Sequence, residues 1–285
     1  MSAGVAGAAP ARRRSWLFTP ATRPDRFARA AETGADVLII DLEDAVAPAD
    51  KAVARKAALD WLAAPGDGRT ARALRVNAPT TAHGLEDLLA LVQGAARPDL
   101  VVIPKAESPD LVRLVDGLLV AAGKPTPLVA MIETARGVAA VEAVAAATPR
   151  LSTLFLGAAD LAADLGAEVA WEPLLHARSR VVAAAAAAGL ETLDSPFFTL
   201  ADEAGLRAEV GAARRLGFTG KAAIHPRQVA VINEALTPGP EAVAEARRIL
   251  AENAKGVGVV DGRMVDEAVA RKARRLLAAA GEAEG

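Results

Sequence analysis

Cysteine and tyrosine are absent from this chain, and only three histidines occur among its 285 residues. Without cysteine there can be no disulfide, no thiolate nucleophile and no sulfur-ligated zinc. Without tyrosine, no phenol can act as an acid or base. The histidines are His83, His176 and His225, and no two of them are close in sequence. A metal ion in this protein therefore depends largely on oxygen ligands, which favours Mg²⁺ or Mn²⁺ over zinc or copper.

Long apolar runs and an excess of charge of one sign are also lacking. Hydrophobic residues make up 52% of the sequence, but no unbroken run approaches the roughly 20 residues that span a bilayer. The net charge is −2 with both signs scattered along the chain, which argues against a nucleic-acid surface or a polybasic membrane patch. We expect a soluble globular protein, long enough for one α/β barrel of about 250 residues.

The chain opens with an Ala/Gly-rich stretch that shows no periodic pattern, and residues 1–12 are predicted to form a disordered tail. The run Arg12-Arg13-Arg14 invites interpretation as a twin-arginine export signal. The apolar stretch after it, Trp16-Leu17-Phe18, is ended by Thr19-Pro20 and is shorter than the roughly 7–15 residues of a signal core. We therefore expect the protein to stay in the cytoplasm.

From Ser15 onward, short apolar segments alternate with amphipathic or Ala-rich helical segments, and no linker interrupts the alternation. The predicted strands are 16–19, 37–40, 73–77, 100–103, 128–132, 154–157, 191–193 and 222–224. Polar residues gather where the strands end, as a (β/α)₈ barrel requires, because its active sites form at the carboxyl rim. Residues 13–236 are therefore predicted to form an α/β TIM barrel. A doubly wound sheet is the alternative, but the Gly-rich phosphate fingerprint expected after its first strand is missing.

Residues 237–285 are predicted to form a C-terminal extension. Helices are expected near 227–236 and 241–253, followed by the Gly-rich link Gly256-Val257-Gly258 and a last helix that ends near Ala280. A closed barrel does not need this appendage. We interpret it as a cap on a neighbouring subunit or an oligomerisation arm.

Two predicted strands run into carboxylates. Strand 128–132 leads directly to Glu133, and the strand that ends at Leu156-Gly157 is followed by Asp160. A carboxylate at the end of a buried parallel strand is costly to place without a cation beside it. We expect Glu133 and Asp160 to hold a divalent metal whose other positions are filled by water or substrate. The alternative is a pair of capping or ion-paired carboxylates, since Arg136 lies one turn from Glu133, and spacing alone favours neither.

Three more acids, Asp41, Glu43 and Asp44, follow the strand at 37–40 and belong to the same predicted rim. Several carboxylates packed together without a cation would raise one another's pKa values. The cluster therefore favours a metal, or groups that orient its waters. Asp44 has a second interpretation as a helix or turn cap.

Basic residues also occur at predicted strand ends. Arg75 can clamp a substrate carboxylate with two parallel hydrogen bonds or form a salt bridge to a rim acid, and the sequence leaves both open. Lys105 is placed as a Schiff-base lysine would be, but no neighbouring residues indicate the desolvation that this role needs, so a structural ion pair is favoured. His225 is interpreted as a satisfied strand-end histidine. The segment 217–221 lacks the spacing of a phosphate-binding loop and is predicted to be a turn.

The chain resembles the HpcH/HpaI aldolase–citrate lyase β-subunit family, in the branch of citrate lyase β-like proteins and malyl- or citramalyl-CoA lyases. The resemblance rests on RSWLFTP at 14–20, IDLEDAV at 40–46, LRVN at 74–77, IPKAE at 103–107, IETARG at 132–137, GAADLAADLG at 157–166 and GFTGKAAIHPRQ at 217–228. These motifs occur in the family's order and cover nearly the whole chain after the tail. One departure is Ala159, where many relatives carry Glu; we expect it to alter tuning or substrate choice rather than abolish the site.

The resemblance implies a TIM barrel assembled as a homotrimer or hexamer, with Mg²⁺ held by Glu133 and Asp160. It implies that Arg75 holds the carboxylate of a bound 2-keto acid and that Glu133 also contacts this substrate. Glu43 and Asp44 would support the waters on the metal. The segment 262–266 is similar to one by which related CoA lyases send an Asp into the neighbouring subunit's site. Asp266 would then be the general acid or base.

The implied reaction is cleavage of a citryl-, malyl- or citramalyl-CoA thioester into an acyl-CoA and a 2-keto acid such as oxaloacetate, glyoxylate or pyruvate. Mg²⁺ would stabilise the developing negative charge as a Lewis acid, and Asp266 would exchange a proton with the enolate carbon. The retained Asp266 motif favours CoA itself over an acyl-carrier partner. A malyl-CoA-type thioesterase and a non-catalytic keto-acid-binding subunit stay open as alternatives.

Overall fold

The computed structural model describes residues 13–66, 68–256 and 258–282. It divides within helix α10 (Pro226–Leu236) into a barrel unit, residues 13–232, and a C-terminal unit that begins at Asn233. The predicted disordered tail, residues 1–12, lies outside the described residues. Among the described helices, none combines the length and the apolarity that a membrane crossing requires.

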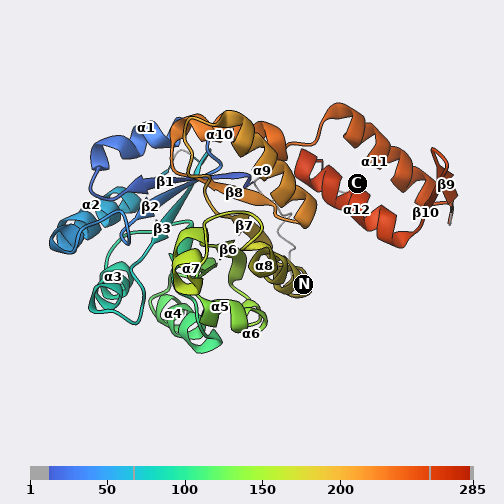
Figure 1. The fold of residues 1–285 in the computed structure, drawn as a ribbon. Coiled ribbons are helices and arrows are strands. Elements are labelled where there is room, and N and C mark those ends of the chain that lie inside the picture. Colours follow the sequence, from blue (N-terminus) through green and yellow to red (C-terminus); the bar gives the residue numbers. More distant parts are fainter. Residues whose placement is uncertain (1–12, 67, 257, 283–285) are drawn as a thin grey trace, which may run out of the picture. The chain divides into compact units, whose positions relative to one another are not determined.

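Eight parallel strands form a closed barrel at the centre of the barrel unit, with helices around it (Figure 1). Each strand pairs with the next along the chain, and β1 pairs with β8 to close the ring, with Trp16 opposite Ala222. The strands are β1 (Ser15–Pro20), β2 (Val37–Asp41), β3 (Ala71–Arg75), β4 (Leu100–Ile103), β5 (Leu128–Ile132), β6 (Leu151–Leu156), β7 (Glu191–Asp194) and β8 (Gly220–Ala223). The predicted (β/α)₈ barrel is therefore confirmed.

The strands are buried on both faces, which explains why they appear in the sequence as near-continuous apolar runs. Alternate residues of each strand pack together in the barrel interior, where Trp16 and Phe155 are the largest side chains. The residues between them face the surrounding helices. The interior is thus a packed core rather than a channel.

Helices of varied length connect the strands. They are η1 (Pro24–Arg26), α1 (Phe27–Ala31), η2 (Pro48–Asp50), α2 (Lys51–Ala63), α3 (Ala82–Gln93), α4 (Pro109–Ala121), α5 (Ala135–Ala139), α6 (Val141–Ala145), α7 (Ala158–Leu165), α8 (Leu175–Ala188) and α9 (Glu203–Leu216). Their starts follow local chemistry. The Thr81 hydroxyl accepts the N–H of Gly84 at 3.1 Å, and the Ser108 hydroxyl accepts that of Leu111 at 3.3 Å. Each bond satisfies a backbone donor that the first turn of a helix leaves free.

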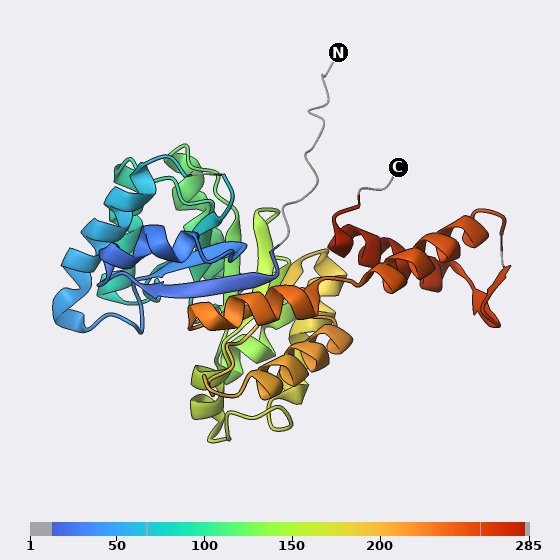
Figure 2. The same ribbon diagram turned by 90° about the horizontal axis from the view of Figure 1, so that it is seen from above.

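The C-terminal unit contains α11 (Pro240–Asn253), the strands β9 (Gly258–Val260) and β10 (Arg263–Val265), and α12 (Glu267–Ala280). Within this unit, α11 and α12 lie side by side, with the β9–β10 hairpin against one end of the pair (Figure 2). The sequence predicted both helices but not the hairpin. Its turn is Asp261-Gly262, with φ of 50° and 76°, and Asp-Gly is a recognised signal for a tight hairpin.

Candidate active site at the carboxyl rim of the barrel

The site begins with the alternation of side chains along three strands. Asp41, Arg75 and Glu133 each lie two positions beyond an interior core residue of β2, β3 or β5. Because strand side chains alternate between faces, all three continue the inward row at the carboxyl end of the barrel. Their side chains are 2%, 6% and 1% exposed, respectively. The strand register therefore places two carboxylates and a guanidinium inside the rim.

The ammonium of Lys105 lies among three of the predicted acids. Its Nζ donates hydrogen bonds to Glu43 Oε1 at 2.7 Å and to Asp160 Oδ2 at 2.9 Å. The same Nζ is 3.8 Å from Glu133 Oε1, and the backbone N–H of Lys105 donates to that oxygen at 2.8 Å. The loops after β2, β4, β5 and β6 are thereby joined at one point. Lys105 is the ion-paired lysine that the sequence favoured over a Schiff-base lysine.

Arg75 forms a salt bridge within the rim. Its Nε and Nη2 each donate to one oxygen of Asp41, both at 2.7 Å. Its Nη1 is 2.9 Å from Glu43 Oε2 and 3.2 Å from Asp44 Oδ2. Asp41 therefore occupies the two parallel donors, Nε and Nη2, that could otherwise clamp a substrate carboxylate. The Nη1 edge is paired with Glu43 and Asp44, so a substrate carboxylate would have to replace these contacts. The Cζ atom of Arg75 lies 4.9 Å from the centroid of the Phe18 ring.

Burial changes the charges at this rim. Burial, with a further contribution from Glu43, raises the pKa of Glu133 to about 8. Burial also raises the pKa of Glu43, although Arg75 and Lys105 oppose the shift. For Lys105 burial alone would lower the pKa, but the hydrogen bonds to Glu43 and Asp160 raise it overall, so the ammonium stays charged. For Glu43 and Glu133, the cations beside them thus do not fully offset the effect of burial.

The donor set fits Mg²⁺. Carboxylate oxygens are the ligands that this hard cation prefers, and Mg²⁺ commonly takes one or two protein carboxylates and keeps water or substrate in its other positions. Glu43 Oε2 is buried and, among the described residues, accepts no hydrogen bond of good geometry. No three His, Asp or Glu side chains in the described part of the chain are arranged as a ready set of metal ligands. If the ion binds here, Glu133 and Asp160 would be its two protein ligands, with water or substrate in the other positions.

Gly157 makes room for one of these carboxylates. A Cβ at this position would lie 2.5 Å from Glu133 Oε2 and 2.8 Å from Met131 Cε. The backbone of Gly157 has an ordinary φ of −96°, so the need for glycine is one of space and not of conformation. The glycine between β6 and α7 therefore allows Glu133 to occupy its place at the rim.

Within the barrel unit, the remaining predicted residues fall outside this contact network or at its edge. Asp44 is 56% exposed and lies beside Arg75; it does not cap the helix that follows it, because the N-cap of η2 is Ala47. His225 is satisfied at the end of β8, where its Nδ1 accepts the N–H of Arg227 at 3.2 Å. Asp266 belongs to the C-terminal unit and is the N-cap of α12, its Oδ1 accepting the N–H of Val269 at 2.9 Å. Its role in a neighbouring subunit's site stays a prediction.

A second buried charge network was missed by the sequence analysis. The register of β7 and β8 pairs Asp194 with Lys221. Lys221 Nζ donates to Asp194 Oδ2 at 2.7 Å and to Glu209 Oε1 at 2.8 Å, and Arg178 Nε donates to Asp194 Oδ1 at 3.0 Å.

The predicted turn at 217–221 is correct only at Gly217, which ends α9 with φ of 121°. Lys221 is a fully buried strand residue. The sequence feature that could have indicated this network was a lysine directly before the predicted apolar strand at 222–224.

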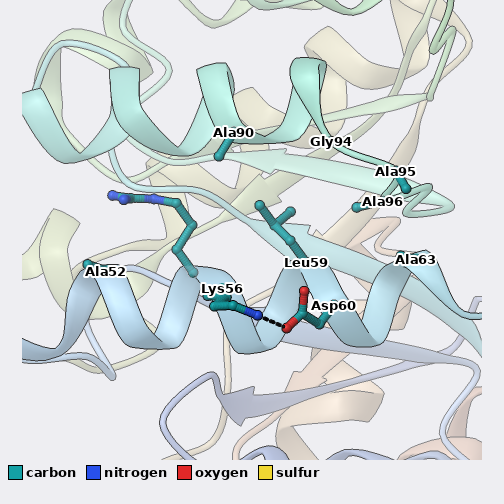
Figure 3. A pocket seen from close by; sticks show the side chains of 10 residues that line it. Ala52, Lys56, Leu59, Asp60, Ala63, Ala90, Gly94, Ala95 and Ala96 are labelled. Atoms are coloured by element: carbon teal, nitrogen blue, oxygen red, sulfur yellow. Dashed lines mark hydrogen bonds and ion pairs between the residues drawn. The ribbon is translucent and has the colours of Figure 1, made fainter.

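A hollow of about 330 Å³ lies between α2 and α3, on the outer helical layer (Figure 3). Its walls are mostly alanine and glycine, and Lys56 donates to Asp60 across its floor at 2.6 Å. None of the rim residues lines it. The hollow is therefore no part of the candidate active site.

Comparison with known proteins gives a family match over most of the barrel. A family model described as HpcH/HpaI aldolase/citrate lyase matches residues 14–226. The L-malyl-CoA/beta-methylmalyl-CoA lyase of Cereibacter sphaeroides is 38% identical over 301 aligned residues, which cover 94% of this chain and 95% of the relative. The citrate lyase subunit beta-like protein of Mycobacterium tuberculosis is 40% identical over 278 residues, covering 94% and 96%.

Solved structures give the same result for the fold. CitE of M. tuberculosis in complex with magnesium, acetoacetate and coenzyme A superposes with a TM-score of 0.81 at 39% identity, covering 95% of this chain and 99% of that chain. RipC of Yersinia pestis superposes with a TM-score of 0.72 at 46% identity, covering 80% and 96%.

Proposed function

The chain belongs to the HpcH/HpaI aldolase/citrate lyase family and is a lyase, and we propose that it cleaves a β-hydroxyacyl-CoA thioester into a 2-keto acid and an acyl-CoA. The observation that carries this proposal is the rim cluster. Glu43, Glu133 and Asp160 converge on one ammonium beside the buried guanidinium of Arg75. A site of this kind binds a divalent cation and an anionic substrate together.

Glu133 and Asp160 would hold Mg²⁺, the ion present with acetoacetate and coenzyme A in the M. tuberculosis CitE structure. When bound, the ion supplies Lewis-acid stabilisation of the negative charge that develops as the carbon–carbon bond breaks. Glu43 and Asp44 flank this position and would accept hydrogen bonds from waters held there.

Arg75 would bind the carboxylate of the keto-acid portion through its Nη1 edge. Asp41 fixes the guanidinium by two hydrogen bonds of 2.7 Å. Asp41 also accepts the backbone N–H groups of Glu43 at 2.9 Å and Ala45 at 3.2 Å, so one carboxylate orients both the arginine and the loop that carries Glu43. The binding groups are therefore preorganised before substrate enters.

Asp266 would exchange the proton at the enolate carbon from the C-terminal unit of a neighbouring copy. This part of the proposal requires an oligomer, and we propose the trimer or hexamer that the sequence resemblance implies. The substrate would be a malyl-, methylmalyl-, citramalyl- or citryl-CoA, with CoA favoured over an acyl carrier. The cytoplasmic location stays a prediction.

A coupled assay of the purified full-length chain with Mg²⁺ against malyl-CoA, citramalyl-CoA and citryl-CoA tests the proposal. The expected products are a keto acid and an acyl-CoA, formed in equal amounts. Free CoA with an intact hydroxy acid would instead identify a thioesterase. Absence of any product, with oxaloacetate still bound, would leave a non-catalytic keto-acid-binding subunit and contradict the proposal.

The role of Asp266 has its own matched pair of variants. Asp266→Asn removes the acid but keeps a side chain that caps helices as well as Asp does, so α12 keeps its start. Asp261→Asn makes the same change at an exposed position of the same unit, in the turn of the β9–β10 hairpin, where the side-chain partner of Asp261 among the described residues is Arg248. We expect turnover to fall by about 100-fold or more in the first variant and to stay near wild type in the second.

A further inference from the structure

Lys105 adopts a backbone conformation that lysine rarely takes. Its φ is 48°, and Asp261 is the other non-glycine residue with positive φ among the described residues. Such a conformation costs free energy for a residue with a Cβ, and it persists where the surrounding contacts determine it. Here the contacts are with the rim carboxylates, because both the backbone N–H and the Nζ of Lys105 donate to them. The strained turn after β4 thus serves to direct this side chain back over the rim.

The ammonium lies where it contacts both carboxylates assigned to the metal. It hydrogen-bonds Asp160 at 2.9 Å and is 3.8 Å from Glu133 Oε1. A dication that uses these carboxylates would come close to the ammonium, and two cations at such a distance repel each other strongly when partly buried. Asp160 and Glu133 therefore cannot serve both cations fully at the same time.

The side chain has the freedom to leave. It is 36% exposed, and the Asp160 side chain that it contacts is 38% exposed. Arg75, in contrast, is 6% exposed and held by two hydrogen bonds to Asp41. Of the two cations that neutralise this rim, Lys105 is the one that can be displaced.

We propose that Lys105 is a tethered counter-ion that occupies the carboxylate cluster in the metal-free enzyme and competes with magnesium for it. Metal binding then displaces the ammonium from Asp160. The ammonium stabilises the metal-free rim and weakens its apparent affinity for Mg²⁺. This inference rests on the proposed metal site, and it concerns the strength of binding rather than its existence.

Calorimetric titration of Mg²⁺ into the full-length chain tests the inference without any assay of turnover. Lys105→Met removes the charge at similar length, and Lys105→Gln removes the charge but retains a hydrogen-bond donor in case the Met variant folds poorly. We expect both variants to bind Mg²⁺ about 10- to 100-fold more tightly than wild type. In EDTA their melting temperatures should be below that of wild type, and saturating Mg²⁺ should close this gap.

Two control variants separate competition from a general charge effect. Lys105→Arg retains a cation at the rim and should keep a magnesium Kd within about threefold of wild type. Lys56→Met makes the same charge change on the outer face of α2, where Lys56 is 78% exposed, and should also leave the Kd unchanged. Equal or weaker Mg²⁺ binding by Lys105→Met and Lys105→Gln, with wild type binding normally, would overturn the inference alone. Failure of wild type and every variant to bind Mg²⁺ would overturn the proposed metal site as well.

Discussion

The barrel carries two buried charge networks at the ends of its strands, and they differ in balance. In the network around Asp194, two carboxylates (Asp194 and Glu209) face two cations (Arg178 and Lys221). The rim cluster consists of Asp41, Glu43, Asp44, Glu133 and Asp160 with Arg75 and Lys105, and so has five carboxylates against two cations. The described contacts neutralise the first network and leave the second with excess negative charge.

The pKa values of Asp194 and Glu133, the most deeply buried acids of the two networks, shift in opposite directions. Asp194 is fully buried, and burial alone would raise its pKa, but Lys221 and Arg178 lower it below the ordinary value. Glu133 is as deeply buried, and its pKa is raised to about 8. A buried acid whose pKa stays low is held in its charged form by neighbouring cations and stabilises the fold through them. A buried acid whose pKa is raised has too little positive charge beside it to offset burial. The comparison is consistent with a structural role for the Asp194 network and supports the proposal that a bound cation completes the rim.

The largest expected effect comes from removing a rim carboxylate. Glu133→Gln keeps the shape of the side chain but removes one of the two proposed ligands for Mg²⁺, and kcat/KM for the proposed CoA thioester should fall by about 1000-fold. Stability in EDTA should be unchanged or higher, because the variant loses a carboxylate that is costly to charge. Steady-state kinetics and urea unfolding measure the two quantities, and a large loss of stability with normal turnover would reverse the assignments of the two networks.

The same kind of change in the other network should act on stability. Asp194→Asn leaves Arg178 and Lys221 buried with one carboxylate, and we expect unfolding free energy to fall by about 3–5 kcal/mol. Glu209→Gln is the matched control and should cost less, since that side chain is 20% exposed. Magnesium affinity of the folded Asp194→Asn protein should stay near wild type; a loss of binding without a loss of stability would contradict the distinction.

The Asp194 network should also give a defined pH dependence. Its lowered folded-state pKa means that the folded state binds fewer protons than the unfolded state in acid. The stabilisation is therefore fully present above the ordinary Asp value of 3.8 and is lost as pH falls through the lower folded-state value. The urea midpoint of wild type should fall as the pH is lowered below about 4. The difference in urea midpoint between wild type and Asp194→Asn should become smaller over the same range. A constant difference down to the acid limit of folding would contradict this.

Gly157→Ala sharpens the comparison by disturbing the rim without removing charge. The new Cβ would lie 2.5 Å from Glu133 Oε2, so Glu133 must move and Mg²⁺ affinity should fall by about 10- to 100-fold. Gly211→Ala, within α9, is the control, since a Cβ there meets only the flexible end of Arg215 at 3.4 Å. Calorimetric titration with Mg²⁺ measures the affinity of each variant. Equal affinities would show that Mg²⁺ binding does not require the space that Gly157 leaves for Glu133.

The smallest effect is a pH trend opposite to that of Asp194. Between the ordinary Glu value of 4.5 and about 8, folded metal-free protein keeps a proton on Glu133 that the unfolded chain has lost. Its stability should therefore decline as pH rises through this window, which lowers the melting temperature. Thermal unfolding of wild type and Glu133→Gln in EDTA from pH 5 to 8 isolates the contribution, because the variant lacks this titration. Parallel curves would show that Glu133 charges without penalty.

Strand-end chemistry was enough to predict the barrel and to place Glu133 and Asp160 at one rim, whereas their role as metal ligands stays a prediction. Parallel strands that close into a barrel end at one rim, so residues just beyond them meet there whatever the details of packing. The contact of Lys105 with the acids depends on a left-handed turn after Pro104 that no local signal indicates. The partnership of Asp194 with Lys221 depends on the register of two strands of four residues each, and short apolar strands leave register undetermined in the sequence.

The most direct test of the distinction between the two networks is a crystal structure of the full-length chain soaked in Mn²⁺, with anomalous diffraction to locate the ion. We predict an anomalous peak in contact with Glu133 and Asp160 and none beside Asp194. A peak at Asp194, or no peak at the rim under conditions in which the enzyme is active, would contradict the account.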